Sequence, residues 1–142
     1  MESKEKSSKT ILIRCGDGAL NHLHYHHFPD DHVVALAGTV HEGLMVIDSA
    51  TALMRNIGDF ANLKEASKVV ITTHEACGRY VASYGEDGFD RHMLVTHVQQ
   101  LAHDIQDHYG HLEVVGYCLS GCGKTWELGE PVIWLAARTV AV

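Results

Sequence analysis

Three side chains with affinity for soft metal ions stand where predicted strands end. The apolar run 69–73 (VVITT) is followed by His74, and Cys77 comes three residues after that histidine. Cys15 closes an earlier apolar run, residues 10–15 (TILIRC). If these strands are neighbours in a parallel sheet, their carboxyl ends meet at one edge and the three side chains converge there. Two thiolates and one imidazole suit a tetrahedral zinc ion and leave a fourth position for water or another ligand.

The elements that would position these side chains alternate along the chain. Apolar runs predict strands, and apolar residues at helical spacing predict helices that end at Gly58 and Gly110. We expect strands at 10–15, 32–37, 68–72 and 112–116, helices at 42–56 and 92–109, and an antiparallel return within 125–136. This alternation predicts an α/β fold with a mostly parallel central sheet, about four parallel strands plus an antiparallel edge strand, flanked by helices. Residues 1–9 are expected to be a flexible polar tail, and residues 10–142 a single domain.

The composition limits the classes of partner. A chain of 142 residues with 46% hydrophobic residues has the length and apolar content of one globular domain. Its net charge of −7 disfavours nucleic acids and anionic membranes, because both need a concentrated basic surface. The polar start MESKEKSSKT has no signal-peptide core, so we expect a cytoplasmic protein. In that compartment the four cysteines are expected to be thiols or metal ligands rather than disulfides.

The order of these motifs resembles that of the β-class carbonic anhydrases. In that family a first strand ends in Cys-x-Asp-x-Arg and a later strand in His-x-x-Cys-Gly, and the two cysteines and the histidine bind zinc. Here residues 15–19 read Cys-Gly-Asp-Gly-Ala, and residues 74–78 read His-Glu-Ala-Cys-Gly. The resemblance covers roughly residues 10–130 and includes an Ala-Gly turn at 37–38. It implies a β-carbonic-anhydrase-like fold with Zn²⁺ on Cys15, His74 and Cys77.

The resemblance also implies a reaction, the reversible hydration of carbon dioxide to bicarbonate by zinc-bound hydroxide. In this interpretation the protein is a zinc lyase with Asp17 as its catalytic carboxylate, and it forms a homodimer or a larger homo-oligomer. Ala19, however, stands where the family has the arginine that pairs with this aspartate. Arg14 and Arg79 are candidates to replace it. If neither does, Asp17 should tend to ligate the zinc, and the alternative function is a non-catalytic or gated zinc-binding protein with Asp17 as fourth ligand.

Other histidines and cysteines have simpler interpretations. Taken singly, cysteines at strand ends are more often core residues than ligands. In NHLHYHHF (21–28), within the His22–His27 cluster, His22 and His26 lie four residues apart and could bind a second metal, although a solvated helix face or a subunit contact is the simpler expectation. The histidines of the last predicted helix and its end mostly fall off the apolar stripe and are expected at the surface: His92, His97, His103, His108 and His111.

The segment SGCGKT (120–125) resembles part of a phosphate-binding loop. The full motif needs a glycine where Cys118 stands and a helix after the loop, whereas the following residues have strand character. We therefore expect a hairpin turn. Cys118 and Cys122 could form a second, weaker metal or redox pair, but a structural role is the better interpretation because only two ligands are evident.

Overall fold

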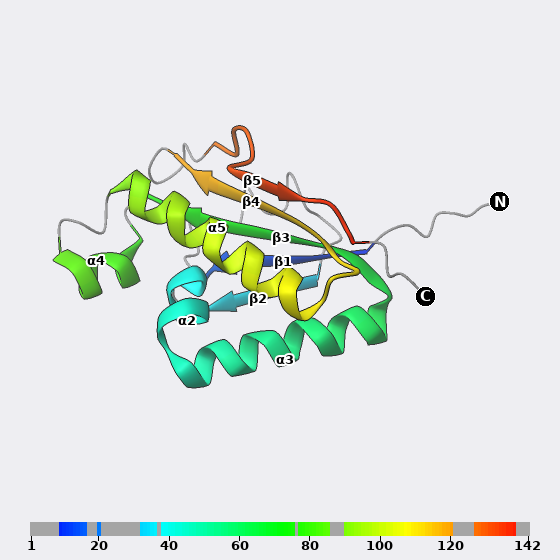
Figure 1. Ribbon diagram of the computed structural model, residues 1–142. Coiled ribbons are helices and arrows are strands. Elements are labelled where there is room, and N and C mark those ends of the chain that lie inside the picture. Colours follow the sequence, from blue (N-terminus) through cyan, green and yellow to red (C-terminus); the bar gives the residue numbers. More distant parts are fainter. Residues whose placement is uncertain are drawn as a thin grey trace.

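The structure is a computed structural model that describes residues 9–16, 20, 32–36, 38–75, 77–85, 90–120 and 127–138. Within them the elements follow in the order β1 (Lys9–Cys15), β2 (His32–Leu36), α2 (Thr39–Met45), α3 (Ile47–Lys64), β3 (Ala66–His74), α4 (Gly78–Tyr84), α5 (Arg91–His108), β4 (Glu113–Leu119) and β5 (Ile133–Leu135) (Figure 1). Because β1 begins at Lys9, that residue belongs to the sheet and not to the expected tail, whose other residues, 1–8, lie outside the described part.

The described strands form one sheet in the order β2-β1-β3-β4-β5. Neighbouring strands are parallel except for β5, which runs antiparallel to β4 at the edge. The predicted fold class is therefore confirmed, including the antiparallel edge strand. Strands β1 and β3 are direct neighbours, with Ile13 level with Ile71, and the Thr72 hydroxyl donates a hydrogen bond to the Ile13 carbonyl at 3.1 Å.

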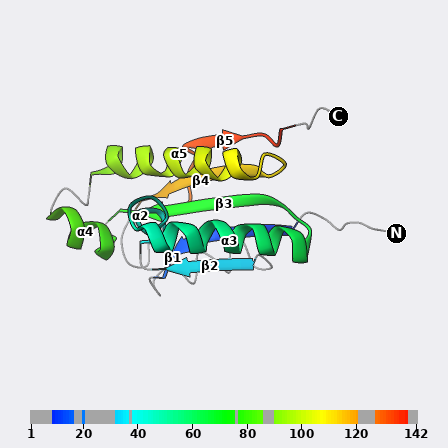
Figure 2. The same cartoon turned by 60° about the horizontal axis from the view of Figure 1, so that its bottom comes forward.

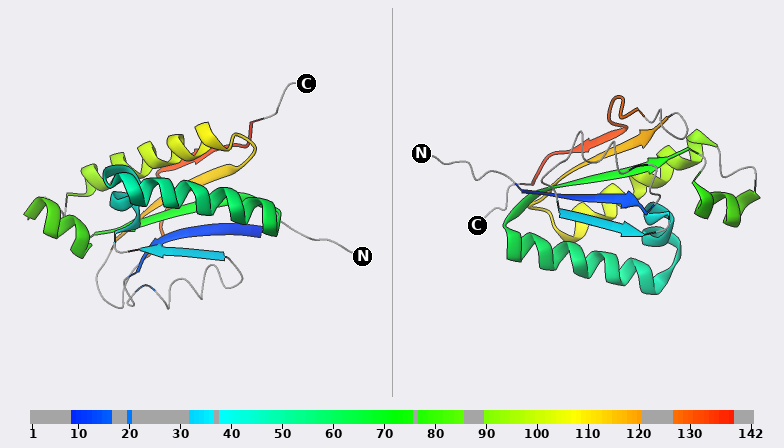
Figure 3. Two further views of the ribbon diagram at one scale, coloured as in Figure 1. Left: turned by 90° about the horizontal axis from the view of Figure 1, so that it is seen from below. Right: turned by 180° about the vertical axis from the view of Figure 1, so that it is seen from behind.

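Helices α2, α3 and α5 lie against one face of the sheet (Figures 1 and 3). Alternate strand residues point towards them, since side chains along a strand alternate between faces. Ile13 and Ile71 share a buried core with Ile57 of α3 and Ile105 of α5. Val70 points to the opposite face and is buried as well. Burial on both sides explains why the central strands read as continuous apolar runs.

The helices differ from the prediction in two places. The helix expected at 42–56 is two helices, α2 and α3, separated by Val46 in an extended conformation. The predicted stop at Gly58 is wrong, because Gly58 lies inside α3. A side chain there would collide with the ring of Tyr109, whose hydroxyl donates to the Met54 carbonyl at 2.7 Å. Gly58 therefore does not end the helix. It leaves room for the ring of Tyr109, the residue that caps the end of α5.

Helix α4, which the sequence patterns did not predict, projects beyond the carboxyl ends of the parallel strands (Figures 1 and 2). It follows β3 almost immediately and begins at Gly78, directly after Cys77. The edge of the sheet that faces α4 is the one at which sites form in parallel α/β sheets. In the described residues we find no helix that is both long enough and apolar enough to cross a membrane.

Candidate metal centre

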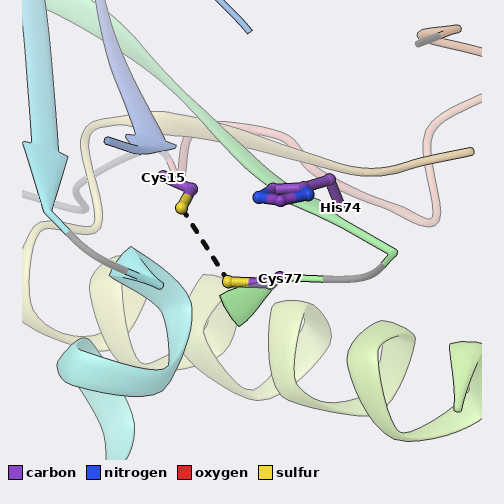
Figure 4. Close-up of side chains that lie close together, drawn as sticks. All are labelled: Cys15, His74 and Cys77. Carbon is purple, nitrogen blue, oxygen red and sulfur yellow. Dashed lines mark hydrogen bonds between the residues drawn. The ribbon is translucent and has the colours of Figure 1, made fainter. Parts of the chain in front are cut away.

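Three buried side chains meet at the carboxyl ends of β1 and β3 (Figure 4). Cys15 is the last residue of β1, His74 the last of β3, and Cys77 the N-cap of α4. Their sulfur and nitrogen atoms all lie within 4.8 Å of one another, and no other set of three or more potential ligands in the described residues is as close. The structure therefore brings together the three side chains that the two sequence motifs single out.

The spacing of the two sulfurs fits a shared metal ion. Cys15 Sγ and Cys77 Sγ are 3.8 Å apart, and neither cysteine is in a disulfide. Two sulfurs bound to one tetrahedral zinc ion at about 2.3 Å each would be separated by about 3.8 Å. The donor set of two sulfurs and one imidazole nitrogen is one that zinc accepts in proteins. The residues present thus fit zinc in both chemistry and spacing.

The orientation of His74 also suits a ligand. Its Nδ1 lies 2.9 Å from the Glu75 carbonyl oxygen, which can only accept, so Nδ1 carries the proton and Nε2 carries the lone pair. Glu75 is itself held in place, because its amide donates to the Leu119 carbonyl at 3.2 Å and its carboxylate lies 3.7 Å from Arg91. This loop fixes the tautomer that a metal-binding imidazole requires.

The beginning of α2 lies against Cys15. The Gly38 amide donates to Cys15 Sγ at 3.3 Å, and the Thr39 hydroxyl donates to the Arg14 carbonyl. Gly38 has φ = 58°, a left-handed conformation that favours glycine. From the sequence, Gly38 is predicted only to be part of an Ala-Gly turn. In the structure it is a contact of the site, one that residue type alone does not reveal because the donor is a backbone amide.

The environment of Cys77 favours the neutral thiol in the metal-free protein. Its hydrogen bond with Cys15 raises the pKa of Cys77 well above the ordinary range, and burial and the Cys15 sulfur raise it further. Hydrogen bonds from the backbone amides of Tyr80 and Arg79 act in the opposite direction and lower the pKa of Cys77. The pKa is raised on balance, so a metal ion must displace a proton to bind here.

The remaining residues of the first motif are only partly described. Asp17 and Ala19 lie outside the described residues, so the role of Asp17 stays a prediction. Of the two arginines considered as partners for it, Arg79 forms an ion pair with Glu42, Nε to Oε1 at 2.7 Å. Arg14 Nε donates to the Cys15 carbonyl at 2.9 Å.

Of the other predicted metal-binding residues, only Cys118 lies in the part of the chain that the structure describes. The His22–His27 cluster and Cys122 lie outside the residues that the structure describes. Cys118, near the end of β4, is buried in the same apolar cluster as Cys15 and Cys77, yet it is not part of the close ligand group. Burial raises the pKa of Cys118 to about 11, which describes a neutral structural thiol.

One predicted surface histidine is only partly exposed. His97 is half-buried, and its Nδ1 lies 3.0 Å from the hydroxyl of the fully buried Tyr80. The sequence analysis also missed His41, which is buried edge-on against Tyr80 and Tyr84, with ring centroids 5.4 and 5.8 Å away. Burial lowers the pKa of both histidines. These contacts depend on α4, which had no signal in the apolar pattern. The other histidines of this group are exposed, as expected: His92, His103, His108 and His111.

Comparison with known proteins places the fold. No family model matches the sequence, and no curated protein matches it. The β-carbonic anhydrase CafD of the filamentous fungus Aspergillus fumigatus matches over 85% of this chain and 88% of its own, with a TM-score of 0.53 and 15% identity. This chain has a β-carbonic-anhydrase-like fold. The β-carbonic anhydrase TvaCA1 of the protozoan Trichomonas vaginalis matches over 97% of this chain and 89% of its own, with a TM-score of 0.54 and 11% identity.

Proposed function

We propose that this protein is a zinc-dependent hydratase that interconverts carbon dioxide and bicarbonate, with Cys15, His74 and Cys77 as its metal ligands. The observation that carries the proposal is the convergence of these three buried donor atoms within 4.8 Å. They meet at the sheet edge where parallel α/β folds bind ligands. The β-carbonic-anhydrase-like fold supports the choice of reaction, and the sulfur spacing supports zinc as the ion.

Each residue has a defined task in this proposal. Bound zinc supplies an acidified water, with a pKa of about 7 in well-studied zinc enzymes, as a nucleophile for a small electrophile. Cys15 and Cys77 would hold the ion as thiolates, and His74 would bind it through Nε2, because its Nδ1 is hydrogen-bonded to the Glu75 carbonyl. Two thiolates would offset more of the charge of the ion than three imidazoles would, so this site would acidify water less strongly. Asp17 would accept the hydrogen bond that orients this nucleophile, which is the role that the resemblance implies for it.

Stopped-flow hydration of carbon dioxide by zinc-loaded protein tests the reaction. We expect a rate above the uncatalysed one that is lost in Cys77→Ser. The matched control is Cys118→Ser, since Cys118 is buried nearby but lies outside the ligand group. This variant should keep both its zinc and its rate. A zinc-loaded protein that shows no catalysed rate from mildly acidic to alkaline pH would refute the hydratase assignment.

A second function is a closed or gated zinc site in which Asp17 is the fourth ligand. Two observations favour it: Ala19 replaces the family arginine, and Arg79, one of the candidates to replace that arginine, is paired with Glu42. A carboxylate near a divalent cation with no competing cation tends to ligate the metal. This state predicts activity that appears only at alkaline pH. A flat pH profile of the hydration rate would argue against gating.

The proposal extends to assembly and location. By analogy with the family, we propose a homodimer or a larger homo-oligomer in the cytoplasm, acting on a small-molecule substrate. Light scattering of the zinc-loaded protein tests the assembly directly. A single species with the 15.6 kDa mass of one chain would contradict it.

A further inference from the structure

The start of α2 lies beside both sulfurs of the candidate metal centre. The amide of Gly38 donates to Cys15 Sγ at 3.3 Å. On its other side Gly38 meets α4, since a Cβ atom built on Gly38 would lie 3.4 Å from Cys77 Sγ and 2.7 Å from Arg79 Cγ. The backbone at this position therefore touches the surroundings of both cysteines. Because hydrogen bonds from Gly38 and Thr39 join α2 to the end of β1, a displacement of α4 relative to α2 would change the distance between the two cysteine sulfurs.

One turn further along, Glu42 joins α2 to α4. Its amide donates to the Gly38 carbonyl at 3.0 Å, which ties it to the start of α2. Its Oε1 pairs with Arg79 Nε at 2.7 Å, and its Oε2 accepts from the Ser49 hydroxyl at 3.3 Å. The Glu42 side chain is only 13% exposed, so this short, charge-assisted contact is partly shielded from solvent. Arg79 lies two residues after Cys77.

Helix α4 depends on such contacts for its position. It has seven residues, too few for a stable helix on its own, and it projects beyond the end of the sheet (Figures 1 and 2). Tyr80 anchors it to α5 through His97, and Arg79 anchors it to α2 through Glu42. Cys77 is the N-cap of this helix, so its sulfur moves with α4.

We propose that Glu42 is a positioning residue of the metal centre: through Arg79, its carboxylate holds α4 and thereby sets Cys77 Sγ at metal-binding distance from Cys15 Sγ. This inference rests on the proposed metal centre but does not require hydratase activity. Groups that orient metal ligands typically change metal affinity by about 10–100-fold when they are removed.

Titration of the metal-free protein with cobalt(II) alone, followed by thiolate-to-cobalt charge-transfer absorption and chelator competition, tests the proposal. We expect Glu42→Gln and Arg79→Gln each to weaken cobalt binding by about tenfold, and the double variant to be no weaker than either. The urea midpoint of each metal-free variant shows whether the loss reflects unfolding. Arg79→Gln changes a side chain that is 40% exposed, so it tests the contact with little disturbance of buried groups.

The double variant separates positioning from charge. If Glu42 only neutralised a cation near the metal, Arg79→Gln would tighten cobalt binding and the double variant would regain wild-type affinity. Either result would overturn the proposal, as would wild-type affinity in both single variants. Asp107→Asn is the matched control, because it breaks an exposed ion pair with Arg138 (3.2 Å) away from the centre, and its affinity should not change. A wild-type protein that binds no cobalt would overturn the metal centre together with this inference.

Discussion

Gly38→Ala should damage both the stability of the protein and its metal centre. At φ = 58° an alanine costs about 1–2 kcal/mol relative to glycine. Its Cβ atom would also overlap the Arg79 Cβ and lie 2.7 Å from Arg79 Cγ, and relieving such overpacking typically costs about 1–3 kcal/mol. Together these terms lower the free energy of unfolding by about 2–5 kcal/mol, against a total of about 5–15 kcal/mol for an ordinary domain. The helix that must yield carries Cys77, so cobalt affinity should fall as well.

Urea unfolding of the metal-free protein measures the first effect, and cobalt titration measures the second. Gly129→Ala is the matched control because Gly129 also has a positive φ (66°), while a Cβ atom there would meet nothing within 4 Å. It should show the backbone strain alone, about 1–2 kcal/mol, with unchanged cobalt affinity. Equal losses of stability in the two variants, or wild-type cobalt affinity in Gly38→Ala, would refute the reasoning.

Three further predictions concern the surroundings of the ligands. Arg91→Ala removes the ion pair with the carboxylate of Glu75, whose carbonyl is the hydrogen-bond partner of His74, and should weaken cobalt binding by about tenfold; unchanged affinity would show that this ion pair does not help to orient His74. Burial lowers the pKa of His97 below its ordinary value of 6.5. As the pH falls through 6.5, His97 therefore takes up a proton in the unfolded chain before it does so in the folded protein, and the free energy of unfolding decreases. Urea unfolding measured at and below pH 6.5 should show a weaker pH dependence of the free energy of unfolding in His97→Gln than in wild type. An unchanged pH dependence would contradict the lowered pKa of His97. Because the pKa of Cys77 is raised, metal binding near neutral pH should release protons, and calorimetry in buffers of different ionisation enthalpy should give different apparent heats; identical heats would count against thiolate ligation.

Much of the fold could be predicted from the sequence, because buried parallel strands have continuous apolar runs. The runs around Ile13 and Ile71 predict central strands, and the structure places them side by side. The helix boundaries could not be predicted as well, because they depend on tertiary contacts. Gly58 reads as a stop in isolation, yet it lies inside α3 where a tyrosine needs the space. Helix α4 is short and held by a few side chains, so it leaves no periodic pattern.

The candidate site divides in the same way. Cys15, His74 and Cys77 could be predicted because three metal-binding residue types occur together at strand ends, in a motif order that resembles a known family. The groups that position these three ligands could not be predicted. Gly38 acts through its backbone amide, and Glu42 acts through a residue 37 positions away in the sequence, a contact that exists only after α2 and α4 have docked.

X-ray absorption at the zinc edge, on protein loaded with one equivalent of zinc, tests the central claim most directly. The shell should contain two sulfurs at about 2.3 Å together with nitrogen or oxygen ligands at about 2.0–2.2 Å, and Cys77→Ser should lose one sulfur. A wild-type shell of nitrogen and oxygen alone would contradict the claim that Cys15 and Cys77 grip the same ion.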